Sequence, residues 1–126
     1  MSAAYPVLDV IFAHPRRASF RLRFTCDDWD DLPPSINLLR ADGGYIPAQR
    51  QPSDPHEYVF ANSGSVFNSG AHERTGQPFV CMRGSREFHT HAGHRSELWD
   101  NYRGQPGNDL LGLLDQLWRV WERAAR

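Results

Sequence analysis

The chain has 126 residues, 40% of them hydrophobic, and a formal net charge of −1. This length and composition predict one domain over residues 1–126 with a single modest core. The sequence has no apolar run long enough to span a membrane, and its near-zero charge favours neither nucleic acid nor an anionic membrane as a partner.

All 14 basic side chains are arginine, which excludes chemistry that requires a catalytic or phosphate-binding lysine. The first thirty residues lack a basic start followed by an apolar run, so we expect a cytoplasmic protein. In that compartment the two cysteines, Cys26 and Cys81, are expected to be reduced. A metal-binding or catalytic thiol is then of more interest than a disulfide.

Four segments in the first part of the chain are predicted to be strands. Residues 5–13 alternate in polarity, and Phe20 to Cys26 show the clearest pattern, with one apolar face and one polar face. Cys26 continues the apolar face and is predicted to be a small core residue. Residues 35–39, after a Pro-Pro pair, and residues 58–61 are the third and fourth strands.

The rest of the chain is predicted to be a loop followed by helices. Residues 62–78 are rich in Asn, Ser and Gly and are expected to form a long loop. A short helix is predicted near residues 95–102, and a longer amphipathic helix follows the predicted cap Asn108. The fold class is α+β: an antiparallel meander of about four strands, then a metal-binding hairpin or loop, and a packed C-terminal helix.

The candidate metal ligands lie between Pro78 and His94. A strand over residues 86–91 would place Glu87, His89 and His91 on one face. Whether Cys81 joins them depends on the turn at residues 84–85: a two-residue hairpin sends it to the other face, and a three-residue loop with a bulge places it opposite His89.

A thiolate, a carboxylate and two imidazoles suit Zn²⁺. A His-x-His pair without further donors is equally typical of surface residues, so the prediction depends on Cys81 and Glu87. His94 is a reserve donor at the rim. The donor set of the prediction is therefore Cys81, Glu87, His89 and His91.

The spacing Cys81-x5-Glu87-x-His89-x-His91 resembles the signature of a bacterial family of predicted metal-binding domains named for its Cys-Glu-His-His residues. The resemblance extends to the Pro-Pro pair, the Trp99-Asp100 segment and the Trp-rich terminal helix. It implies these four residues as ligands. It also implies a partner among ubiquitin-like proteins or their conjugation machinery, because genes of that family lie beside such systems.

The order of elements also resembles the fold of ubiquitin-conjugating enzymes and their RWD relatives. The sequence departs from that pattern because no His-Pro-Asn tripeptide precedes Cys81 and no helix is predicted before the first strand. A carrier role for Cys81 is one alternative function, although coordination to a metal would occupy the sulfur lone pair that a nucleophile needs.

Two other His-x-His families fit less well. The isopeptidases of the JAB type need Ser and Asp at longer offsets than Ser96 and Asp100 provide. The chain differs by one residue from the cupin pattern in both the Gly-to-His and the His-to-Glu spacing, and a helix is predicted where a barrel needs further strands.

If four donors close the coordination shell, the ion is structural, which is the favoured interpretation. If one position is open, the metal could activate water for hydrolysis, with Glu87 as base and His94 or Glu97 moving protons. A solvated turn is predicted for the acidic residues Asp27, Asp28, Asp30 and Asp31. Loop positions without a role are predicted for His14, His56 and His72. Core positions are predicted for Trp99, Trp118 and Trp121.

Overall fold

The computed structural model describes residues 2–50 and 66–125, with side chains for residues 5–50 and 66–124. Its centre is a six-stranded sheet in the order β1-β2-β3-β4-β6-β5, with every neighbouring pair antiparallel. The strands are β1 (Ser2–Ala4), β2 (Val7–His14), β3 (Arg17–Thr25), β4 (Ser35–Arg40), β5 (Phe67–Asn68) and β6 (Phe79–Val80). The three predicted strands that fall on described residues are confirmed as β2, β3 and β4, and β1, β5 and β6 are not among the four predicted strands.

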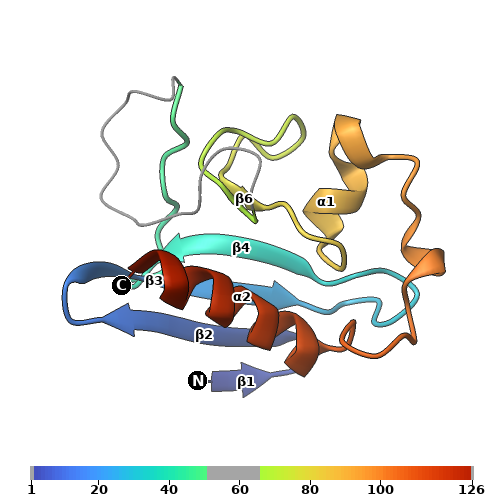
Figure 1. Cartoon of the computed structure of the whole chain (residues 1–126), viewed down its shortest axis with the longest axis horizontal. Helices are drawn as coiled ribbons and strands as arrows, with labels where there is room; N and C mark the ends of the chain where they lie inside the picture. Colours follow the sequence, from blue (N-terminus) through green and yellow to red (C-terminus); the bar gives the residue numbers. More distant parts are fainter. Residues whose placement is uncertain (1, 51–65, 126) are drawn as a thin grey trace.

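Two helices and two short 3-10 turns complete the described fold: α1 (Arg86–Thr90), η1 (Ala92–His94), η2 (Trp99–Asn101) and α2 (Leu110–Ala125). Helix α2 lies across one face of the sheet, whereas α1 stands beside β6, beyond the edge of β4 (Figure 1). Within the described ranges no helix has both the length and the apolar character that crossing a membrane requires.

The alternation of β3 builds the core. Phe20, Leu22 and Phe24 are fully buried, and Cys26 continues the same face, as predicted. Helix α2 covers this face with a completely buried stripe at helical spacing, Leu113, Leu117 and Trp121. Burial of each such side chain contributes about 1.5–3 kcal/mol, so the association of α2 with the sheet is mainly hydrophobic.

The prediction of a strand over residues 86–91 is wrong, because α1 occupies this segment. Ser85 caps the helix, since its hydroxyl oxygen accepts a hydrogen bond from the backbone N–H of Phe88 at 3.1 Å. Gly84, with φ at +102°, provides the left-handed turn before it. A Cβ at Gly84 would also collide with a methyl group of Leu113 on α2.

Several other local predictions need correction. The helix expected at residues 95–102 is replaced by η1, an irregular segment and η2. Asp109, not Asn108, caps α2, because its carboxylate accepts the N–H of Gly112 at 2.7 Å. Trp118 is 41% exposed, unlike the buried Trp99 and Trp121, because it lies beside the buried stripe of α2. The predicted strand at residues 58–61 and His56 lie outside the described residues.

The opposite face of the sheet carries a buried aspartate held by two partly exposed arginines. Asp9 on β2 accepts hydrogen bonds from the guanidinium groups of Arg21 and Arg23 on β3, and each nitrogen–oxygen distance is 2.9 Å. The Asp9 side chain is only 11% exposed. Its hydrogen bonds with Arg23, and secondarily with Arg21, lower the pKa of Asp9 from 3.8 to about 2. The native state therefore favours the ionised carboxylate more than the unfolded state does.

We predict that Asp9→Asn lowers the free energy of unfolding at pH 7 by about 1–2 kcal/mol, after allowance for solvent screening at the two arginines. A lowered pKa stabilises the native state fully above the unfolded value and loses this effect as the pH falls towards the folded value. The difference between the two proteins should therefore shrink between pH 4 and pH 2 in urea unfolding. Asp42→Asn is the control, because its pair with Arg40 is exposed; equal effects of both substitutions would contradict the prediction.

Candidate metal centre

Within the described residues, one group of three side chains has donor atoms close enough to share a metal ion: His72, Glu73 and His91. One ring nitrogen from each histidine and one carboxylate oxygen all lie within 4.8 Å of one another. His72 and Glu73 belong to the loop between β5 and β6, whereas His91 caps the C-terminal end of α1. The group therefore joins this loop to α1.

His72 is fixed deep in the structure, with only 1% of its surface exposed. Its Nδ1 accepts the backbone N–H of Arg74 at 3.0 Å, so the ring proton lies on Nε2, which donates to the carbonyl oxygen of Glu87 at 2.9 Å. The ring of Phe79 packs edge-on against it at a centroid distance of 4.8 Å. The imidazole therefore has a defined orientation and a defined tautomer.

Glu73 and His91 form the more accessible part of the group, with each side chain 32% exposed. His91 Nδ1 lies 2.8 Å from Glu73 Oε2, and the other oxygen, Oε1, accepts the backbone N–H of Ala92. The hydrogen bond from His91 lowers the pKa of Glu73 from 4.5 to about 2, so this carboxylate is ionised at all ordinary pH values. The group thus combines an anionic oxygen with two imidazoles.

Of the four ligands predicted from the sequence, only His91 belongs to this group. Glu87 points to the sheet, where Oε1 accepts the N–H of Ile36 at 2.7 Å and Oε2 accepts the hydroxyl of Ser35 at 2.8 Å. Burial raises the pKa of Glu87, and these two hydrogen bonds oppose the increase. Its carboxylate anchors α1 to the first residues of β4.

His89 projects from α1 in a different direction from Glu87, because residues two apart in a helix do not share a face. Gly84 N–H donates to its Nε2 at 3.1 Å, and its Nδ1–H donates to the carbonyl oxygen of Glu97 at 2.5 Å. Burial lowers the pKa of His89, which favours the neutral ring. Both nitrogens are therefore occupied by hydrogen bonds.

Cys81 is half-buried and follows β6 directly. Burial raises the pKa of its thiol, and the negative charge of Glu97 raises it further, so little thiolate forms at neutral pH. His94, the reserve donor, has Nδ1 2.6 Å from Glu97 Oε2 and stacks on Phe88 at 4.0 Å. Its ring centroid lies 5.7 Å from that of His91, so His94 lies beside the group.

His72 is predicted from the sequence to have no role, and Glu73 is not among the predicted ligands. The loop that carries them has no periodicity in its sequence. Only the fold brings them to His91, which follows Glu73 by 18 positions and His72 by 19. The adjacent pair His72-Glu73 was the only signal for this half of the group, and an isolated pair is weak.

No protein-family model matches this chain, and no curated protein matches it either. The chemistry of the site is therefore inferred from its own donor atoms and their surroundings.

Glu87 provides a test of how α1 is positioned. We predict that Glu87→Ala lowers the free energy of unfolding at pH 7 by about 1–3 kcal/mol, because the buried N–H of Ile36 loses its acceptor. Glu87→Gln should lower the free energy of unfolding by less, since the amide oxygen of glutamine can still accept this hydrogen bond and its NH₂ group can donate to Ser35. Urea unfolding of both variants measures the difference, and an alanine variant as stable as the glutamine variant would contradict the role of anchor.

Proposed function

We propose that this protein binds a divalent transition-metal ion, Zn²⁺ in the first place, through His72, Glu73 and His91. The observation that carries the proposal is the convergence of two imidazole nitrogens and one ionised carboxylate within 4.8 Å. Imidazole and carboxylate are ordinary zinc ligands, and a set of two histidines and one glutamate is a known zinc site composition.

The three donor atoms lie within a span that one metal ion can bridge after small movements. Ligands bound at about 2.0–2.1 Å in a tetrahedron lie about 3.3 Å apart. His91 Nδ1 and Glu73 Oε2 are 2.8 Å apart, and the third donor lies within the 4.8 Å limit of the group. Modest side-chain movements would therefore bring all three donors to bonding distance.

The surroundings of His72 also suit a ligand. A metal-bound histidine usually donates its other ring N–H to a carbonyl or carboxylate, which fixes the ring. His72 already makes such a bond from Nε2 to the carbonyl oxygen of Glu87. Ligation through Nδ1 would keep that bond but requires the backbone N–H of Arg74, which donates to Nδ1, to move away.

The ion could serve two functions. An ion held by the three donors of the group joins the loop before β6 to α1 whatever its fourth ligand is, so we favour a structural role. With water as the fourth ligand the ion could activate it for hydrolysis. Cys81 as a thioester carrier is less favoured, because the raised pKa of its thiol disfavours the nucleophilic thiolate.

The family resemblance adds the proposal that the domain acts beside a bacterial ubiquitin-like modification system on a fold similar to that of ubiquitin-conjugating enzymes. Its ligand set of Cys81, Glu87, His89 and His91 is an alternative to the group proposed here. The two sets share only His91, so substitutions at the other positions distinguish them.

The experiment is a Zn²⁺ titration of tag-free protein by calorimetry, preceded by elemental analysis of the purified protein. We expect one ion per chain, and Glu73→Gln or His91→Ala should weaken binding at least tenfold. Binding should also weaken in acid, because protons compete with the metal for the imidazole nitrogens.

Two controls complete the titration. His14→Ala removes a histidine outside the group and should leave the affinity unchanged. Cys81→Ser should also leave it unchanged; a loss of binding in Cys81→Ser together with normal binding in Glu73→Gln would overturn the proposed group in favour of the set expected from the sequence. Circular dichroism of each variant verifies that it is folded.

A further inference from the structure

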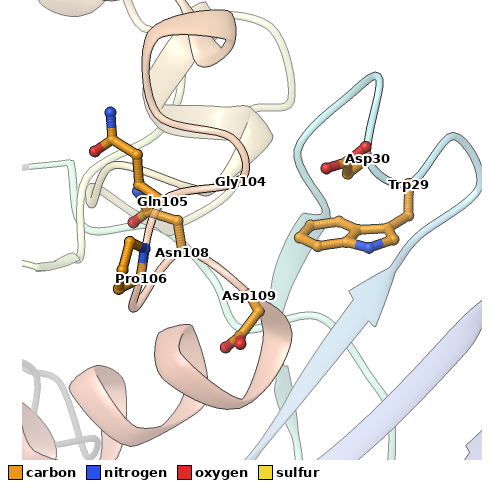
Figure 2. A pocket seen from close by; sticks show the side chains of 7 residues that line it. All are labelled: Trp29, Asp30, Gly104, Gln105, Pro106, Asn108 and Asp109. Atoms are coloured by element: carbon orange, nitrogen blue, oxygen red, sulfur yellow. The ribbon is translucent and has the colours of Figure 1, made fainter.

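A second feature lies apart from the metal group, where the loop between β3 and β4 approaches the start of α2. A cavity of about 270 Å³ opens there between Trp29 and Asp30 on one side and residues 104–109 on the other (Figure 2). None of the residues that line it is basic.

Neither carboxylate of the cavity forms an ion pair with a described residue. Asp30 has neither an ion pair nor a side-chain hydrogen bond with any described residue, and Asp109 accepts only the N–H of Gly112. Two neighbouring aspartates do form ion pairs, Asp27 with Arg86 and Asp31 with Arg103, whereas Asp28, which does not line the cavity, has none among the described residues. The cap at Asp109 also offsets the positive end of the α2 dipole, which would otherwise oppose a cation.

The amide side chains of the lining add further acceptors. Asn108 donates through Nδ2 to the carbonyl oxygen of Tyr102 at 2.9 Å, and Gln105 donates through Nε2 to that of Asn101 at 2.6 Å. Their donor groups are thus used within the chain, and the carbonyl oxygens of both amides have no partner among the described residues. The polar side chains of the cavity therefore offer acceptors.

Trp29 adds an aromatic surface. Its side chain is 38% exposed although it packs against Trp99, with ring centroids 6.0 Å apart. Figure 2 shows its ring extending into the space between Asp30 and Asp109. An aromatic face beside uncompensated carboxylates attracts cations through the ring quadrupole and through charge.

We propose that this cavity binds the guanidinium group of an arginine side chain on a partner polypeptide. A guanidinium presents five donors, pairs with a carboxylate through two parallel hydrogen bonds and stacks on an indole ring, so it matches every element of the lining. A lysine ammonium satisfies the charge but neither the stacking nor the paired geometry. The site is independent of the metal group.

The test uses the full chain labelled with ¹⁵N and the peptide acetyl-Gly-Arg-Gly-amide, titrated at low ionic strength. The indole N–H signal of Trp29 should shift in a saturable way. The same peptide with citrulline, a neutral isostere of arginine, should bind at least tenfold more weakly, and the lysine peptide should bind more weakly than the arginine peptide. Raising the salt concentration should weaken arginine binding.

Matched variants locate the site. Asp30→Asn and Asp109→Asn preserve size, and asparagine still caps a helix, so each should reduce affinity several-fold without loss of structure. Trp29→Leu should do the same. Asp28→Asn, in the same loop but outside the lining, should leave affinity unchanged. The absence of binding at millimolar peptide, equal binding of the citrulline peptide, or equal effects of Asp28→Asn and Asp30→Asn would each overturn the proposal.

Discussion

The attachment of α1 to the sheet depends on the buried carboxylate of Glu87. Its two oxygens accept hydrogen bonds from the first two residues of β4, Ser35 and Ile36, while its own backbone carbonyl accepts the ring N–H of His72. One residue thus connects the sheet, the short helix and the loop before β6. The five residues of α1 are too few to be stable alone, so these external contacts hold the helix in place.

This arrangement gives the candidate metal group a rigid side and an adaptable side. His72 is buried and bonded at both ring nitrogens, whereas Glu73 and His91 are partly exposed and paired with each other. In the proposed metal-bound state the ion would replace the hydrogen bond between His91 Nδ1 and Glu73 Oε2, and the ring proton of His91 would lie on Nε2. The pair is therefore stable without metal and has its carboxylate already ionised for binding.

The long strands β2, β3 and β4 were predictable from the sequence, but the short strands β1, β5 and β6 and most of the site were not. The alternation of β3 is a local pattern with period two, and the burial of Phe20, Leu22 and Phe24 follows from it directly. The segment of α1 is too short for periodicity to decide between strand and helix, and the decisive signal was the cap Ser85. The proximity of His72 and His91 arises from a non-local packing that no local pattern encodes.

The close approach of Gly84 and Leu113 joins two parts of the molecule that are far apart in sequence. The turn before α1 fits against α2 only because residue 84 has no side chain, and its left-handed backbone is itself best suited to glycine. A displacement of α2 along the sheet would move Leu113 against or away from this turn, which also donates the N–H that His89 accepts. Close packing at Gly84 thus makes the position of the histidine-bearing helix depend on the side chain of Leu113 on the C-terminal helix.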